Sequence, residues 1–277
     1  MDQDKIRNVA IIAHVDHGKT TLVDKLFRQS GMFRDNQEVA ERLMDSMDLE
    51  RERGITIASK NGSYTYGDYK INIIDTPGHA DFGGQVERVM RMADGVVLLV
   101  DAQEGPMPQT FFVVKKALAA KLPILVLVNK IDKDGARCEW VVDEVFDLLA
   151  RLEAPDETLD FPVVYGSAKN GYMVKDPHDP IVPGQGMDLI SEMIVNHVPP
   201  PPGDINAPLQ LQINTIDYSP YLGRMGIGRV ANGTLRLNES IVVYRRDGSV
   251  KPVRISKIFG FVGDVQVPMD AAYAKYF

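Results

Sequence analysis

The stretch Val9-Ala10-Ile11-Ile12-Ala13-His14-Val15-Asp16-His17-Gly18-Lys19-Thr20 decides the fold of this chain. Its first residues form a short apolar run that indicates a buried strand, and Thr21–Phe27 after it has the spacing of an amphipathic helix. A strand, a tight loop and Gly-Lys-Thr at the start of a helix form the pattern of a phosphate-binding loop. Backbone N–H groups at such a helix N-terminus favour a bound anion. The stretch therefore predicts a phosphate site.

Two side chains of this loop have a defined chemical use at such a site. Lys19 supplies a positive charge for the β- and γ-phosphates, and Thr20 offers a hydroxyl to Mg²⁺. One position departs from the pattern G-x-x-x-x-G-K-[ST], because Ala13 stands where the pattern has glycine. Alanine fits there when the backbone has a negative φ, which we therefore expect.

Composition and charge are those of a globular protein in a reducing compartment. The chain has 277 residues, enough for one large or two ordinary domains, and Cys138 is its only cysteine. The net charge of −7 argues against broad non-specific nucleic-acid binding, although it allows a local basic patch. The start has no signal-peptide pattern, and no apolar run reaches the ~18 residues of a membrane span. We expect a cytoplasmic protein.

Residues 1–200 alternate strand and helix signals, which predicts a three-layer α/β domain with a mostly parallel sheet. We expect a hairpin at 62–74, buried strands at 96–101, 124–128 and 161–165, and helices at 84–92, 108–120, 137–152 and 187–197. The segment 170–186 is rich in Pro and Gly, which predicts a loop. The charge run at 48–53 is typical either of a solvated helix face or of a mobile loop.

The pattern changes after four consecutive prolines, Pro199–Pro202, which predict a stiff domain boundary. Beyond them the apolar residues recur with a period of two, as at Leu209, Leu211 and Ile213. Asn232-Gly233 and Asp247-Gly248 are typical of hairpin turns between apolar runs. The pattern of residues 204–277 therefore predicts the antiparallel strands of a small β-barrel.

Further polar segments follow the predicted strands of residues 1–200, and the ends of parallel strands meet at one edge of a sheet. Asp75 stands where a carboxylate would hold Mg²⁺ through water. The string Asn129-Lys130-Ile131-Asp132 is an N-K-x-D motif. The carboxylate of Asp132 can accept two hydrogen bonds from guanine, whereas adenine lacks that pair of donors. Ser167-Ala168-Lys169 can supply a backbone N–H to the guanine oxygen. Each string is weak alone, but together and in this order they predict a guanine nucleotide site.

With these motifs the chain resembles the translational GTPases, and within them it is most similar to the BipA/TypA group through Ala13–Leu26 and Asp217–Val230. The resemblance implies a P-loop GTPase domain at 1–200, followed at 204–277 by a β-barrel of the translation-factor domain II type. The chain stops at Ala274-Lys275-Tyr276-Phe277, and its last six or so residues do not continue the family pattern, which would bring at least one more strand. We therefore expect the barrel to be truncated, as in a fragment or a reading frame that ends early.

The resemblance also implies roles for individual residues. Thr56 would close on Mg²⁺ and the γ-phosphate, and Asp75 and Gly78 would form a second switch. His79 would orient the attacking water, and large-subunit rRNA would position the His79 side chain. Asp16 would help to fix the phosphate loop together with a monovalent cation. The expected catalytic residues are His79, Lys19 and Thr56, the expected metal ligands are Thr20, Thr56 and Asp75, and the expected GTP-binding residues are Asp16, His17, Gly18, Lys19, Thr20, Thr21, Asp75, Gly78, Asn129, Lys130, Asp132, Ser167, Ala168 and Lys169.

The activity implied by the resemblance is Mg²⁺-dependent hydrolysis of GTP to GDP and phosphate. The implied partner is the ribosome, through rRNA and ribosomal proteins, with no DNA or membrane partner and a monomeric chain. The alternatives are a LepA-like elongation factor, the GTPase subunit of a sulfate-activating enzyme, and a GTP-sensing interaction module without useful hydrolysis. A zinc site at His14, His17 and His79 is disfavoured, because no cysteine or carboxylate cluster completes it.

Overall fold

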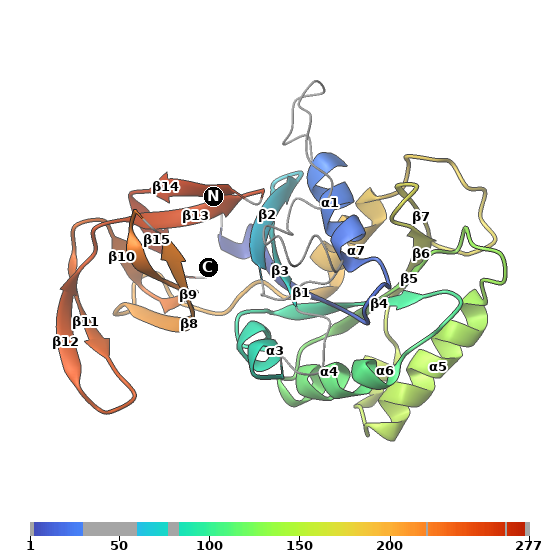
Figure 1. Ribbon diagram of the computed structural model, residues 1–277, viewed down its shortest axis with the longest axis horizontal. Helices are drawn as coiled ribbons and strands as arrows, with labels where there is room; N and C mark the ends of the chain where they lie inside the picture. Colours follow the sequence, from blue (N-terminus) through green and yellow to red (C-terminus); the bar gives the residue numbers. More distant parts are fainter. Residues whose placement is uncertain (1–2, 30–59, 77–82, 220, 264, 275–277) are drawn as a thin grey trace.

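A computed structural model of the chain describes residues 3–29, 60–76, 83–219, 221–263 and 265–274 (Figure 1). The elements up to residue 197 are η1 (Gln3–Lys5), β1 (Ile6–Ala13), α1 (Lys19–Gln29), β2 (Lys60–Tyr66), β3 (Tyr69–Asp75), α3 (Gly83–Met90), β4 (Gly95–Asp101), α4 (Pro108–Ala119), β5 (Ile124–Asn129), α5 (Cys138–Arg151), α6 (Asp156–Leu159), β6 (Val163–Ser167), β7 (Tyr172–Val174) and α7 (Asp188–His197).

These strands form one sheet in the order β2-β3-β1-β4-β5-β6-β7. The five central strands, β3 to β6 in that order, run parallel, and β2 and β7 are antiparallel to their neighbours. Every residue of β4 and β5 is buried, as expected for parallel strands that are covered on both faces. The predicted α/β fold with a mostly parallel sheet is confirmed.

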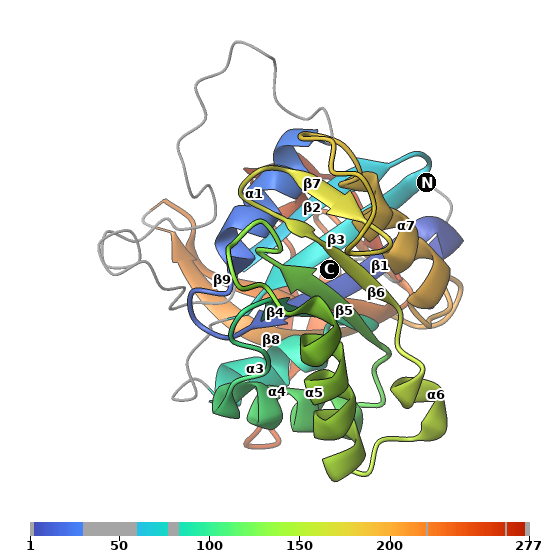
Figure 2. The ribbon, with the colours of Figure 1, turned by 90° about the vertical axis from the view of Figure 1, so that its right-hand side faces the viewer.

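Helices cover both faces of the sheet, because successive side chains of each strand point to opposite sides. Val9 and Ile11 of β1 pack in one cluster with side chains of α1 and α7. Ala10 and Ile12 pack in the other cluster with side chains of α3, α4 and α5. Figure 2 shows α3, α4 and α5 side by side along one face, with α1 and α7 on the opposite side. The three-layer arrangement brings the carboxyl ends of β1, β4, β5 and β6 to one edge.

The predicted hairpin is present as β2 and β3, which meet at the pair Tyr66↔Tyr69. The predicted loop at 170–186 is wrong in one part, because Tyr172–Val174 forms the buried strand β7 and pairs with β6. A triplet is too short to show a period in the sequence. It becomes a strand because the edge of β6 offers unpaired backbone groups. The charge run 48–53 lies outside the described residues.

Beyond the prolines the strands are β8 (Gln210–Ser219), β9 (Gly223–Asn232), β10 (Thr234–Arg236), β11 (Ser240–Tyr244), β12 (Val250–Arg254), β13 (Ile258–Val262), β14 (Val265–Met269) and β15 (Ala271–Tyr273). They form four antiparallel pairs, β8-β9, β10-β15, β11-β12 and β13-β14, which make a partial barrel. Asp247-Gly248 turns between β11 and β12 as predicted, with Gly248 at φ 80°.

The predicted hairpin at Asn232-Gly233 is wrong. The chain does turn there, with Gly233 at φ 73°, but β9 pairs with β8 and β10 pairs with β15. The dipeptide determines a local backbone conformation, whereas the partner of each strand is chosen by the packing of the barrel.

The partial barrel contacts the sheet along β2. Ser63 and Gly263 exchange two backbone hydrogen bonds of 2.9 and 2.8 Å, and the Ser63 hydroxyl donates to the carbonyl of Phe261 over 2.5 Å. Figure 1 shows β13 and β14 beside β2 at this side of the molecule. Among the described residues, no helix is both long enough and apolar enough to cross a membrane.

Candidate nucleotide-binding site

The phosphate-loop sequence forms a tight connection between β1 and α1. Ala13 is the last residue of β1 and pairs with Leu99 in the parallel ladder, so it has the extended backbone that alanine tolerates. Gly18 has φ 97°, and a Cβ added to it would lie 2.5 Å from Asn129 Nδ2. Glycine is therefore required here both for its backbone conformation and for the close approach of a neighbouring side chain. The departure at Ala13 does not disturb the loop.

Lys19 opens helix α1, and Thr20 and Thr21 follow in its first turn. The helix ladder starts at once, because Leu22 N–H donates to Gly18 O over 2.9 Å. Lys19 is 7% exposed, Thr20 is half-buried and Thr21 is exposed. The N-terminus of this helix and Lys19 thus follow the carboxyl end of β1, at the edge of the sheet where a phosphate is expected.

Asn129, the last residue of β5, connects two loops of the site. Its Nδ2 donates to the carbonyl of His17 over 2.8 Å, and its Oδ1 accepts from the N–H of Ala168 over 2.9 Å. Asn129 is 2% exposed, so both bonds are shielded from water. One amide side chain therefore fixes the distance between the phosphate loop and Ser167-Ala168-Lys169.

His17 is buried under the loop and held from both ring nitrogens. The N–H of Asp101 donates to His17 Nδ1 over 3.3 Å, and Nε2 lies 3.2 Å from Glu104 Oε2. Nδ1 also lies 3.4 Å from the carbonyl of Leu99. A proton on Nε2 satisfies the Asp101 and Glu104 contacts, whereas a proton on Nδ1 satisfies the Leu99 carbonyl. Burial lowers the pKa of His17 below its ordinary value, with a further contribution from His14, so the ring is neutral at pH 7. His17 acts as a support of the loop from within.

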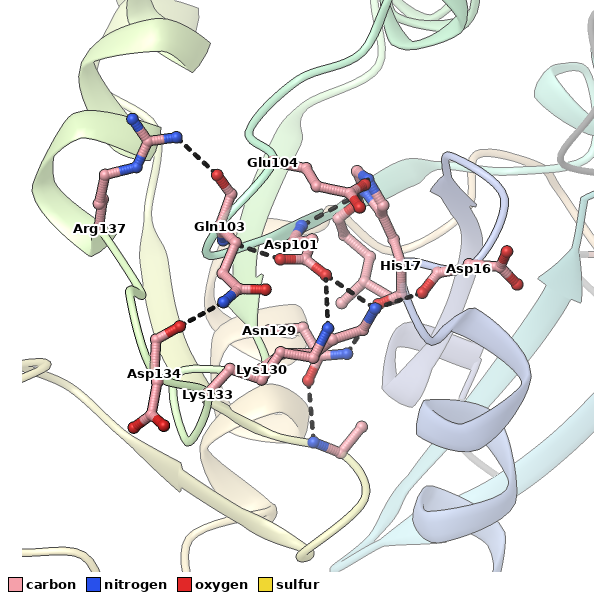
Figure 3. Close-up of polar contacts among 12 residues, drawn as sticks. Asp16, His17, Asp101, Gln103, Glu104, Asn129, Lys130, Lys133, Asp134 and Arg137 are labelled. Atoms are coloured by element: carbon pink, nitrogen blue, oxygen red, sulfur yellow. Dashed lines mark hydrogen bonds and ion pairs between the residues drawn. The ribbon is translucent and has the colours of Figure 1, made fainter.

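A buried ion pair lies beside this histidine (Figure 3). Asp101, the last residue of β4, has no exposed surface, and its Oδ2 lies 2.7 Å from Lys130 Nζ and 3.7 Å from Lys133 Nζ. Burial by itself would raise the pKa of the Asp101 carboxyl, but Lys130 and the N–H of Gln103 outweigh it and hold that pKa below its ordinary value. The Lys130 ammonium also donates to the carbonyl of Asp16.

The carboxylate of the N-K-x-D motif lies at the protein surface. Asp132 is exposed, and its Oδ2 accepts a hydrogen bond from Asn170 Nδ2 over 3.0 Å. Ser167 and Ala168 are buried, while Lys169 is exposed. The N–H of Ala168 already donates to Asn129, so a guanine oxygen would have to share or replace that bond.

The remaining predicted site residues lie on or after β3. Asp75 is the last residue of that strand and pairs with Ile11, but its side chain is not among the described atoms. Thr76 is buried, and its hydroxyl donates to the carbonyl of Ile11 over 2.8 Å. Gly78 and His79, and Thr56 as well, lie outside the described residues.

Sequence reasoning missed several supporting residues of the site. Asp101 follows the apolar run of β4 directly, and a carboxylate in that position is the signal that could have revealed it. Glu104 and Asn170 carry no comparable signal. Gln103 Nε2 donates to the carbonyl of Asp134, and Arg137 donates to the carbonyl of Gln103 over 2.7 Å. These hydrogen bonds connect the loop after β4 with the loop after β5.

Comparisons with known proteins place residues 4–200 in a GTP-binding domain family and identify relatives of the whole chain. Residues 4–200 match the family described as the elongation factor Tu GTP binding domain. The chain is 55% identical over 272 residues to the "Large ribosomal subunit assembly factor BipA" of Bacillus subtilis strain 168, covering 98% of this chain and 44% of that protein. It is 52% identical over 271 residues to the protein of the same name from Escherichia coli strain K12, with the same coverage. The chain thus spans less than half the length of these relatives.

A solved structure shares the fold. A crystal structure of a Thermus thermophilus protein superposes with a TM-score of 0.71 at 17% sequence identity, covering 99% of this chain and 52% of that one. At this level of identity the likeness concerns the fold alone. It includes both the sheet and the strands beyond the prolines, because nearly all of the present chain is covered.

Proposed function

This chain belongs to the BipA family of translational GTPases, and from that premise we propose that it binds GTP and GDP and hydrolyses GTP with the help of Mg²⁺. We assign residues 1–200 to the GTP-binding domain and 204–277 to a β-barrel domain. The observation that carries the proposal is Asn129, whose amide bonds both the phosphate loop and Ala168. A nucleotide binds only where its phosphate site and its base site lie a set distance apart, and the two hydrogen bonds of Asn129 fix that distance.

The phosphate end of the site would consist of backbone N–H groups at the start of α1 and the Lys19 ammonium. Their positive charge favours the β- and γ-phosphates in the ground state and, more strongly, the charge that develops in phosphoryl transfer. Lys19 is nearly buried, so its charge is little screened by water.

The base end would be read by Asp132. Its carboxylate is exposed and oriented by Asn170, so a guanine can reach it without displacing a buried partner. A guanine presents an N–H and an amine to such a carboxylate, and adenine does not. This difference supports selection of guanine nucleotides.

The donor set fits Mg²⁺, which prefers hard oxygen ligands. Thr20 would supply its hydroxyl from the first turn of α1, and Asp75 and Thr56 would complete the set of protein oxygens. An ion held by these oxygens would supply positive charge that offsets the negative charge of the phosphates. A monovalent cation near Asp16 is part of the same proposal, and so is His79 as the group that orients water.

The ribosome is the proposed partner, in the cytoplasm. The relatives are named for assembly of the large ribosomal subunit, and 272 residues of this chain align with the Bacillus subtilis protein at 55% identity. A role on ribosomes would also account for a GTPase whose water-orienting His79 needs an external group to position it. The chain would act as a monomer on this partner.

The decisive experiment measures GTP binding and hydrolysis by the 277-residue chain, with and without 70S ribosomes and with Mg²⁺ present or chelated. We expect GTP binding, slow hydrolysis alone and faster hydrolysis with ribosomes. Slow hydrolysis that ribosomes do not change would restrict the proposal to the nucleotide site. Absence of GTP binding would overturn it.

A matched variant tests the base contact. Asp132→Asn removes the carboxylate that accepts from the guanine amine, while an amide can pair with the oxygen of xanthine. We expect the variant to lose affinity for GTP and to gain it for xanthosine triphosphate. Unchanged preference for GTP would remove Asp132 from base recognition.

A further inference from the structure

We propose that Asp101 is a positioning residue of the nucleotide site, because its buried carboxylate holds the Lys130 side chain across the phosphate loop. The inference rests on the proposed function, since it concerns how tightly that site keeps a guanine nucleotide. Asp101 belongs to none of the sequence motifs of the site. It reaches the site only because β4 lies between β1 and β5 in the sheet.

The first step concerns the carboxylate itself. Asp101 has no exposed surface, and its Oδ1 accepts the N–H of Gln103 over 2.8 Å while Oδ2 faces Lys130 Nζ at 2.7 Å. A carboxylate in such a place must be paired, because the desolvation of an unpaired ion is costly. Lys133 lies farther away, at 3.7 Å, and is 45% exposed, so it is the weaker partner.

The second step follows the ammonium group. Lys130 Nζ is shared between the Asp101 carboxylate and the Asp16 carbonyl, which joins the ends of β4 and β5 to the phosphate loop (Figure 3). Both Lys130 and Asp16 have φ 65°, a left-handed conformation that is unfavourable for residues other than glycine. Such backbones persist where surrounding contacts hold them, and the shared ammonium joins these two residues.

The third step connects this geometry to binding. Without Asp101, the long Lys130 side chain would regain its rotamer freedom and the Asp16 carbonyl would lose a charged donor. Nucleotide binding would then have to order the phosphate loop, and the free-energy cost of this ordering would lower the affinity. The pair therefore organises the loop before the nucleotide arrives.

The test uses fluorescent GDP and GTP analogues with the full chain and four variants: Asp101→Asn, Lys133→Met, Lys130→Met and the double variant Asp101→Asn/Lys130→Met. Asp101→Asn keeps the shape of the side chain and the bond from Gln103. We expect it to weaken both nucleotides about tenfold, mostly through faster dissociation. Lys133→Met is the matched control, since it removes the weaker lysine, and we expect binding within about twofold of the unaltered chain.

The double variant separates positioning from general support of the fold. If Asp101 acts through Lys130, the double variant binds nucleotide no more weakly than Lys130→Met alone. The reason is that Lys130→Met already removes the ammonium group that Asp101 positions. If the affinity losses of the two single variants multiply in the double variant, the inference is overturned. Unchanged nucleotide binding by Asp101→Asn would overturn it as well. If Asp101→Asn does not fold, the comparison of the double variant with Lys130→Met decides alone. Failure of the unaltered chain to bind GDP would instead overturn the proposed function, and this inference with it.

Discussion

Arg229 Nη1 lies 2.9 Å from Asp94 Oδ1, and this ion pair joins strand β9 to the residue that precedes β4. The pair is buried, with 11% of the Arg229 side chain and 7% of the Asp94 side chain exposed. Asp94 Oδ2 accepts from Asn8 Nδ2 over 2.8 Å, and Asn8 Oδ1 accepts from Asn72 Nδ2 over 2.7 Å. A continuous chain of buried polar groups therefore runs from β3 through β1 to the partial barrel.

Replacing Arg229 should destabilise the protein. Arg229→Met leaves the Asp94 carboxylate buried without its cation, and we expect the free energy of unfolding at pH 7 to fall by about 3 kcal/mol. Urea denaturation measures this loss. Arg224→Met, an exposed position on the same strand, is the control and should change stability by less than about 0.5 kcal/mol. Adding Asp94→Asn to Arg229→Met should recover most of the loss, and equal stabilities of the two arginine variants would contradict the argument.

The same pair predicts a pH dependence. Burial raises the pKa of the Asp94 carboxyl above its ordinary value, with Arg229 and Asn8 opposing it. A carboxyl whose pKa is higher in the folded state than in the unfolded state costs stability once it ionises, and that cost is relieved as the pH falls through the folded-state pKa. Arg229→Met removes an opposing charge and raises this pKa further. The stability deficit of the variant should therefore shrink as the pH is lowered from 7 through the raised folded-state pKa of Asp94, and a constant deficit would disprove the assignment.

Gly18→Ala should abolish nucleotide binding. The added Cβ would lie 2.5 Å from Asn129 Nδ2 and the residue would keep φ 97°, so the bond from Asn129 to the phosphate loop must break. Gly67→Ala is the matched control, since Gly67 has φ 55° in the β2-β3 turn and no atom within 4 Å of an added Cβ. We expect that control to cost about 1 kcal/mol of stability and to bind GDP normally. Titration with labelled GDP compares the two, and normal binding by Gly18→Ala would contradict the prediction.

His79→Ala should separate binding from catalysis. The family resemblance assigns this histidine to the orientation of water, which affects the transition state and not the ground state. We expect the variant to bind GTP like the unaltered chain and to lose the ribosome-stimulated part of hydrolysis. Steady-state phosphate release with and without ribosomes is the measurement. Normal stimulation would exclude His79 from the mechanism.

Hydrogen exchange should be faster in the partial barrel than in the parallel sheet. Every residue of β4 and β5 is buried, whereas every residue of β12 is exposed. Few apolar side chains beyond residue 203 are buried in the described part, namely Val230, Leu235, Ile258 and Ala274. Segments with so little burial open locally at low cost, so we expect amides of 204–274 to exchange about 100-fold faster than those of β4 and β5. Equal protection in both regions would refute this.

Much of the fold could be predicted because the parallel strands are long, continuous apolar runs. The runs at β4 and β5 define those strands to within a residue. The errors fall where the local pattern is short or where pairing is decided at a distance, as at β7 and at Asn232-Gly233. In the site, the predicted residues at 16–21, 129–132 and 167–169 come together, while His79 and Thr56 lie outside the described residues and stay predictions.

The sequence by itself determined the order of motifs and their positions at strand ends, since both depend on residue types at short spacing. Only the tertiary structure decided which side chains support them. Asp101 pairs with Asn129 in the β4-β5 ladder, so the next residue, Lys130, can reach back to the Asp101 carboxylate and over to Asp16. Such contacts depend on which strands are neighbours and on their register. Neither is encoded in a local pattern, because the free energy that selects them comes from packing the whole sheet.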